Sequence, residues 1–176
     1  MVEVALRAVR VDLQSRTPVL VLQETGALRR SIPIFIGEPE AVAIECAVRG
    51  VPTPRPLTHD LLRDVIDELG ARVVRVVVTE LRDATYYAEI HLETEHGAKI
   101  VSARPSDAVA LALRTTSPLY VDDELMDDEG RLIELSDEED DDEDDEDVPD
   151  TLGDVDELAE QFRDFLDSVH PEDFQQ

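Results

Sequence analysis

The stretch Lys99-Ile-Val-Ser-Ala-Arg-Pro-Ser-Asp-Ala-Val-Ala-Leu111 decides the class of fold. Its first half favours a strand, Ser106 offers a helix N-cap, and the second half is apolar on every side, as in a buried helix. A similar stretch, Ile32-Pro-Ile-Phe-Ile-Gly-Glu-Pro-Glu-Ala-Val-Ala-Ile44, lies 67 residues earlier and has Glu40 where the other has Asp107. Two strand–turn–helix units predict an α+β domain, and both an internal duplication and a chance match are open.

The surrounding sequence predicts a twisted, largely antiparallel sheet with about three packed helices. Period-two alternation, as in Val2, Val4, Leu6 and Ala8, indicates half-buried strands. Strands are expected at residues 2–13, 18–23, 32–36, 71–79, 85–93, 98–103 and 119–121, and helices at residues 40–49, 58–69 and 107–114.

The helix expected at residues 58–69 is amphipathic. Thr58 offers its N-cap, Gly70 closes it, and a proline-rich surface loop at residues 51–56 precedes it. Its apolar face consists of Leu61, Leu62, Val65, Ile66 and Leu69.

Charge divides the chain into two parts. The 176 residues carry a net charge of −27, of which residues 1–120 contribute −2 and residues 121–176 contribute −25. Such dense acidic sequence cannot bury enough apolar surface to offset its chain entropy. We therefore predict a domain at residues 1–130, a disordered acidic linker at residues 131–154, and a short amphipathic helix with the terminus at residues 155–176.

Several protein classes are excluded. Cys46 is the single cysteine, so no intramolecular disulfide forms, and no Cys/His spacing matches a zinc site. No apolar run approaches the ~20 residues that span a bilayer, and the N-terminus lacks a signal peptide, so a cytoplasmic location without membrane contact is expected. P-loop, GxSxG, HExxH and dinucleotide-binding motifs are absent, as is a basic cluster with interleaved aromatic residues.

The segment Arg55-Pro-Leu-Thr-His-Asp60 is the first candidate site. Backbone N–H groups at a helix N-terminus suit a phosphate or carboxylate ligand, and His59 could transfer a proton near neutral pH. The alternative is structural: Thr58 caps the helix, Asp60 complements the helix dipole and His59 leans on the edge of the core.

The segment Ala103-Arg-Pro-Ser-Asp-Ala108 is the second candidate. Arg104 could hold a phosphate bidentately, and Asp107 could orient a histidine or bind a cation. If the two similar units pack about a pseudo-twofold axis, Glu40 and Asp107 could share a divalent cation such as Mg²⁺ or Mn²⁺. The alternative is that both carboxylates only complement helix dipoles, with Arg104 as a salt-bridge partner.

Four stretches together resemble the bifunctional nuclease domain family over about residues 2–130. They are Ile32 to Ile44, Arg55-Pro-Leu-Thr-His-Asp-Leu-Leu62, Tyr87-Ala-Glu-Ile90 and Ser102-Ala-Arg-Pro-Ser-Asp-Ala-Val-Ala-Leu-Ala-Leu-Arg114. The closing Phe162-Arg-Asp-Phe-Leu-Asp167 resembles actinobacterial members. The resemblance implies an α+β fold and, as in plant members, nuclease activity on RNA and DNA.

The resemblance also implies site residues at the two junctions. His59, Asp60 and Asp107 become catalytic candidates, whereas Arg55, Thr58, Arg104 and Ser106 become substrate-binding candidates. Glu40 and Asp107 are the candidate metal ligands.

Two functions are compatible with these residues. The first is a nuclease that hydrolyses phosphodiester bonds in RNA or DNA and is restrained by its own acidic segment. The alternative is a non-catalytic adaptor that uses the domain as an oligomer or partner interface. A homo-oligomer is expected in either case, and the helix at residues 155–176 is expected to dock on its own domain or on a protein partner.

A truncation tests whether the acidic segment restrains the domain. The acidic segment competes with nucleic acid for a cationic site, and salt weakens that competition. A chain ending at Leu135 should therefore bind or cut nucleic acid better than the full chain at low salt, with the difference shrinking as salt rises. Equal behaviour of the two chains at every salt concentration would leave the segment as a solubilising linker.

Overall fold

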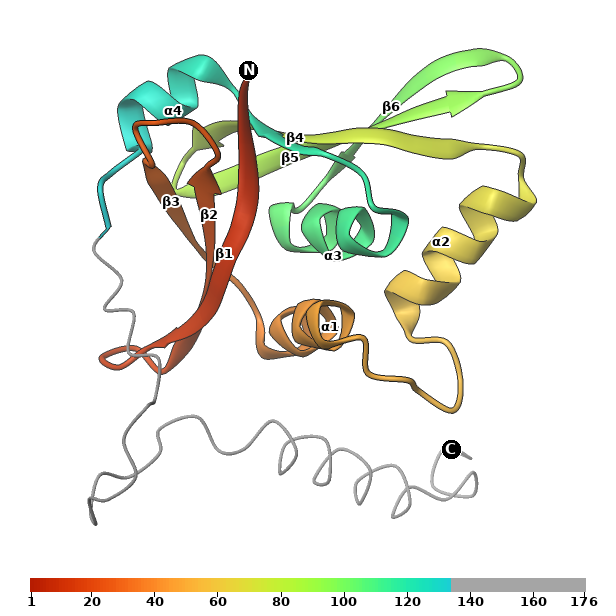
Figure 1. The fold of residues 1–176 in the computed structure, drawn as a ribbon, viewed down its shortest axis with the longest axis horizontal. Helices are drawn as coiled ribbons and strands as arrows, with labels where there is room; N and C mark the ends of the chain where they lie inside the picture. The colour runs from red at the N-terminus through yellow and green to blue at the C-terminus, as the bar shows by residue number, and fades with distance from the viewer. Residues whose placement is uncertain (134–176) are drawn as a thin grey trace. The chain divides into compact units, whose positions relative to one another are not determined.

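Seven strands form one sheet in the order β3-β2-β1-β7-β4-β5-β6 (Figure 1). The computed structural model describes residues 1–133, so most of the predicted acidic linker and all of the predicted helix at residues 155–176 lie outside the described residues. Within residues 1–133, no helix is long and apolar enough to cross a membrane. The strands are β1 (Val2–Asp12), β2 (Thr17–Glu24), β3 (Ser31–Phe35), β4 (Arg72–Arg82), β5 (Thr85–Thr94), β6 (Gly97–Ala103) and β7 (Leu119–Val121), and the helices are α1 (Glu38–Arg49), α2 (Thr58–Glu68), α3 (Pro105–Thr115) and α4 (Asp123–Glu129).

The sheet has two similar halves. Each half is an antiparallel three-stranded meander followed by a helix: β1, β2 and β3 precede α1, and β4, β5 and β6 precede α3. The central strand β7 is antiparallel to β1 and parallel to β4, so the halves run in opposite directions, as they would about a twofold axis perpendicular to the sheet. This arrangement confirms both predicted strand–turn–helix units and puts α1 and α3 side by side on one face (Figure 1).

α3 is the centre of the core. Residues 108–112 each expose 1% or less of their surface, which confirms the buried helix that the all-round apolar pattern predicted. Small alanine side chains allow close approach on several sides, so α3 packs against α1, α2, β4 and β5.

α3 begins earlier than predicted. Its N-cap is Arg104 rather than Ser106, because Pro105 takes the first helical position, where a missing N–H costs nothing. Ser106 consequently lies inside the first turn and is buried.

α2 buries less of its apolar face than its amphipathic pattern suggested. Ile66 and His59 are buried, but Leu61 is 57% exposed and Leu69 is 76% exposed. Residues of α2 contact α3 and β4, at one end of the domain (Figure 1). A helical pattern shows which face is apolar but not how many neighbours cover it.

The alternation of β1 changes along the strand. A bulge between Leu6 and Ala8 shifts the register against β2. Beyond it Val9, not the predicted Ala8, packs against the core. One extra residue in a strand moves every later side chain to the other face.

α4 was not predicted, because its acidic composition resembles the segment that follows. The side chain of its N-cap, Asp122, accepts a hydrogen bond from the backbone N–H of Glu124. The side chains of Leu125 and Met126 are buried in the core. Arg131 then pairs with Ser31 in an isolated bridge, one residue beyond the predicted domain boundary.

Two leucine truncations test this division between buried and exposed helical residues. Leu111→Ala removes a fully buried side chain and should lower the free energy of unfolding by about 2–5 kcal/mol. Leu61→Ala makes the same chemical change on the exposed face of α2 and should change it by less than about 0.5 kcal/mol. Urea unfolding followed by circular dichroism measures both, and comparable losses would show that α2 is covered in solution.

Candidate functional site

Each of the three long helices carries a carboxylate at its third position: Glu40 in α1, Asp60 in α2 and Asp107 in α3. A carboxylate there lies near the unpaired N–H groups and the positive end of the helix dipole. Asp60 acts in this way, accepting a 2.9 Å hydrogen bond from the backbone N–H of Leu57. Glu40 and Asp107 are used differently, because both bind Arg104.

Arg104 joins α1 to α3. Its Nε donates to Asp107 Oδ2 at 2.8 Å, and its Nη2 donates to Glu40 Oε1 at 2.7 Å and to Asp107 Oδ1 at 3.1 Å. Hydrogen bonding to Asp107, and then to Glu40, raises the pKa of Arg104. The side chain is nevertheless 66% exposed, and Nη1 makes no hydrogen bond to a described residue, so part of this cation faces solvent.

His59 reaches the same carboxylate from α2. Its Nε2 lies 3.1 Å from Asp107 Oδ1, and the residue is only 8% exposed. Burial by itself would raise the pKa of Asp107, but the hydrogen bonds from Arg104 and His59 outweigh burial and lower it. Asp107 is therefore ionised at neutral pH, and His59 is held with only Nδ1 available to another partner.

Gly37 makes room for Glu40. A Cβ atom at position 37 would lie 2.2 Å from Glu40 Oε2, far inside van der Waals contact. Glycine at position 37 therefore leaves room for the position that the Glu40 carboxylate takes while it binds Arg104, and a larger residue would require the end of the Glu40 side chain to shift.

A cavity of ≈ 280 Å³ adjoins Arg104. Residues 34–37, from the end of β3 to the start of α1, form one wall, and residues 104–106, at the start of α3, form another. Residues 84–86, at the turn into β5 and its first two residues, complete it. The N-terminal ends of α1 and α3 thus border one hollow, where both helix dipoles favour an anion.

The carboxylates as arranged do not fit a divalent cation. Both oxygens of Asp107 and one of Glu40 already accept hydrogen bonds from Arg104, whose guanidinium lies where a shared metal would have to be. Within residues 1–133, no group of three or more His, Cys, Asp or Glu side chains is placed to hold a metal ion. A cation could bind Glu40 and Asp107 only by displacing Arg104.

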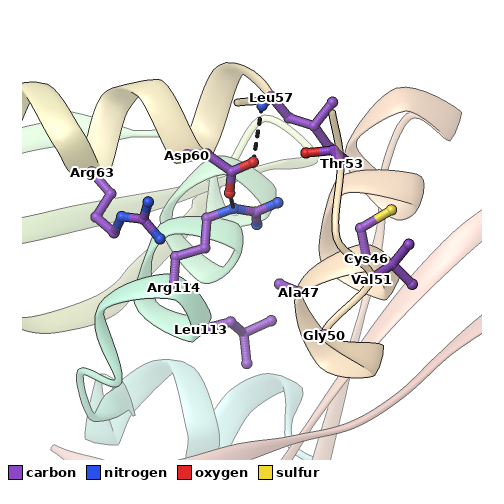
Figure 2. A pocket seen from close by; sticks show the side chains of 10 residues that line it. All are labelled: Cys46, Ala47, Gly50, Val51, Thr53, Leu57, Asp60, Arg63, Leu113 and Arg114. Carbon is purple, nitrogen blue, oxygen red and sulfur yellow. Dashed lines mark hydrogen bonds and ion pairs between the residues drawn. The ribbon is translucent and has the colours of Figure 1, made fainter. Parts of the chain in front are cut away.

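Asp60 belongs to a second cluster, at the other end of α3 (Figure 2). Its Oδ1 accepts a 2.5 Å hydrogen bond from Nε of Arg114, whose side chain is 5% exposed. Burial opposes ionisation of Asp60, but Arg114 and the Leu57 N–H lower its pKa. The ion pair borders a cavity of ≈ 280 Å³ that also contacts Cys46, a half-buried thiol whose pKa burial raises.

The other predicted residues lie apart from the Arg104 cluster or play minor parts in it. Arg55 and Thr58 are exposed, and neither side chain bonds to a described residue. Thr58 is the first residue of α2, and its predicted capping role is taken by the Asp60 carboxylate. Ser106 lines the cavity beside Arg104.

The structure thus unites His59, Arg104, Asp107 and Glu40 and separates Asp60 from them. The repeated unit in the sequence predicted that Glu40 and Asp107 lie close together, and both carboxylates do bind Arg104. Gly37 and Arg114 were missed as parts of these clusters. The Gly-Glu-Pro-Glu segment was a usable signal for Gly37, but nothing local pairs Arg114 with a carboxylate 54 residues away.

Comparison with known proteins identifies the family. The family model for the bifunctional nuclease domain matches residues 20–134, which include both helix junctions. The chain belongs to the bifunctional nuclease domain family. The resemblance seen in the sequence is therefore confirmed, and the Arg104 cluster lies inside the family domain.

Relatives of this domain occur in bacteria and plants. An uncharacterized protein of Mycobacterium tuberculosis is 42% identical over 173 residues, covering 98% of this chain and 97% of its own length. Bifunctional nuclease 2 of Oryza sativa subsp. japonica is 29% identical over 126 residues, which are 66% of this chain and 39% of that protein. Bifunctional nuclease 1 of Arabidopsis thaliana is 30% identical over 121 residues, with 66% and 37% covered.

The lowered pKa of Asp107 predicts a pH-dependent contribution to stability. The folded-state pKa lies below the unfolded value of about 3.9, so the contribution is complete above that value and is lost as pH falls through the folded pKa. Asp107→Asn should lower the free energy of unfolding by about 1–3 kcal/mol at pH 7, and the gap to wild type should close in acid.

Asp64→Asn is the matched control, because Asp64 pairs with Arg63 at the surface of α2. It should change the free energy of unfolding by less than about 1 kcal/mol at any pH. Urea unfolding at a series of pH values measures both variants. A gap for Asp107→Asn that persists unchanged into acid would contradict the assignment of this pKa.

Proposed function

We propose that the chain is a nuclease that hydrolyses phosphodiester bonds in RNA or DNA at the Arg104 cluster. The observation that carries the proposal is that two helices of a bifunctional nuclease domain begin at one cavity beside an exposed arginine. The names of the plant relatives, bifunctional nucleases 1 and 2, support the activity.

Arg104 and the start of α3 are the proposed phosphate site. Among the described residues Nη1 of Arg104 has no acceptor, and the first N–H groups of α3 have no partner within the helix. Glu40 and Asp107 hold the guanidinium in one orientation, which limits the entropy lost when a phosphate binds. These two carboxylates also repel the phosphate, so the proposed phosphate donor is Nη1, the guanidinium nitrogen that contacts neither carboxylate.

His59 and Asp107 are the proposed proton-transfer pair. Asp107 accepts from Nε2–H, which leaves Nδ1 of a neutral imidazole as the basic nitrogen. In the proposed hydrolysis, a water oxygen attacks phosphorus as its proton passes to His59, and the P–O bond to the leaving nucleoside breaks. The leaving oxygen takes a proton from His59 or from solvent.

The cavity walls suit a nucleotide, and the proposed contacts do not distinguish ribose from deoxyribose. Phe35 is largely exposed and Tyr86 is partly buried at the rim, so aromatic faces are available to stack on a base. Contacts to phosphate and to the faces of bases do not depend on whether the sugar has a 2′-hydroxyl group. Activity on both RNA and DNA follows from such a site.

Substitutions at the cluster test the proposal. His59→Gln and Arg104→Gln should each reduce cleavage of single-stranded RNA and DNA by about 100-fold or more, because one removes the proton acceptor and the other a phosphate ligand. Fluorescent oligonucleotide cleavage by purified protein measures the rates, and circular dichroism checks that each variant is folded.

Arg49→Gln is the matched control for Arg104→Gln. Arg49 is exposed in the last turn of α1 and pairs with Glu45 on the same helix, so its loss should leave cleavage unchanged. Equal activity of wild type, His59→Gln and Arg104→Gln would remove this cluster from catalysis.

The same assay tests the two predicted roles that the geometry supports least. Chelation by EDTA and addition of Mg²⁺ or Mn²⁺ test the predicted divalent cation, which would require Arg104 to move aside. Asp60→Asn tests the predicted catalytic role of Asp60. If Asp60 only balances Arg114, this variant should lose stability, while its folded fraction keeps full activity.

A further inference from the structure

β6 is an open edge of the sheet. It is last in the strand order and pairs with β5 on one side only. Within residues 1–133, no strand, helix or loop forms a backbone ladder with its other side. In Figure 1 the β5–β6 hairpin projects at the upper right, on the side of β4 away from α1 and α3. Its outward N–H and C=O groups are therefore available to another strand.

The opposite edge, β3, is closed. Pro33, near its middle, has no N–H to donate, and Ser31 is bridged to Arg131 by two backbone hydrogen bonds of 2.7 and 3.0 Å. Both features are known ways of preventing further strand pairing. The two edges occupy corresponding places in the two halves of the sheet, and only one of them is blocked.

The side chains of β6 also lack the usual protection. Ile100 is 59% exposed and Val101 is 45% exposed, on opposite faces of the strand. The strand has one charged residue, Lys99, no proline, and a register with β5 free of bulges. An exposed apolar edge of this kind is stabilised by a partner strand.

We propose that β6 pairs antiparallel with β6 of a second copy of the chain, about a twofold axis through Ile100. An axis perpendicular to the sheet keeps each face on its own side, so residues of equal parity lie opposite one another. Ile100 then meets its counterpart, and Lys99 lies opposite Val101 rather than a second lysine, which avoids direct repulsion.

The charges on and near β6 do not oppose this partner. In the proposed register the one charged residue of the strand, Lys99, lies opposite an apolar residue. Glu95 of one copy lies near Arg104 of the other, whose Nη1 has no acceptor among residues 1–133. Residues 1–130 have a net charge of −8, of which residues 122–129 contribute −6, so the rest of the domain, which includes β6, is nearly neutral and repels a second copy weakly. A strand whose single charge meets no like charge in this register pairs with its own copy more readily than with a strongly charged strand.

The pairing places two Arg104 clusters on one face of a continuous sheet. Arg104 lies four residues from Ile100, so the two arginines are separated by eight residues along the strands, about 26 Å at ~3.3 Å per residue. The proposal rests on the open edge and not on the nuclease function, so either can fail without the other.

Sedimentation equilibrium of the full chain tests the proposal. The wild type should be a dimer at micromolar concentration, and Ile100→Asp should raise the dissociation constant by about 100-fold, because two carboxylates would meet at the axis. Phe35→Asp is the matched control, since Phe35 is an exposed apolar residue on the blocked edge β3, and it should leave the dimer intact.

A disulfide test fixes the register independently. In a Cys46→Ser background, Ile100→Cys should form an intermolecular disulfide under mild oxidation, because directly opposed residues of antiparallel strands lie about 4.5–5.5 Å apart at Cα. Phe35→Cys in the same background should not. A monomeric wild type, or a dimer that survives Ile100→Asp and is not cross-linked by the Ile100→Cys variant, would overturn the proposal.

Discussion

The guanidinium of Arg104 holds the two halves of the domain together at the place where both of their helices begin. It binds Asp107 on its own helix and Glu40 on α1, which comes from the other half of the sheet. The contact is possible because β7 joins the halves about an approximate twofold axis, which directs the starts of α1 and α3 toward each other. Gly37 contributes to the same contact, since a Cβ atom there would push the Glu40 carboxylate out of its present position.

The first turn of α2 contributes one residue to the Arg104 cluster and the next residue to the ion pair with Arg114. His59 and Asp60 are neighbours in sequence, yet His59 faces Asp107 near the start of α3 and Asp60 faces Arg114 near its end. Consecutive residues of a helix point about 100° apart, so one turn of α2 reaches both clusters. The partly buried Asp60–Arg114 pair joins α2 to α3, and in this arrangement His59 lies against the Asp107 carboxylate. Stability and candidate chemistry are therefore linked through one helical turn.

The approximate symmetry of the sheet is broken where function is expected. Arg104 stands at the N-cap of α3, whereas the equivalent N-cap of α1 is Gly37, so one half supplies the cation and the other supplies space. The edges differ in the same way, since β3 is blocked by Pro33 and Arg131 while β6 is open. Within residues 1–133, the two related halves therefore form a single Arg104 cluster and leave one sheet edge, β6, unpaired.

The sequence by itself determined the strands, the three long helices, the α+β class and the family, but not α4, because period, turn residues and motif order are local properties of the chain. It also foresaw that Glu40 and Asp107 approach each other, because both occupy one place in a repeated unit. Only the tertiary structure decided that Arg104 lies between these carboxylates, that Asp60 pairs with Arg114, and that α2 leaves Leu61 and Leu69 exposed. The reason is physical: which groups neutralise a carboxylate, and which neighbours cover an apolar face, depend on contacts between residues that are distant in the chain.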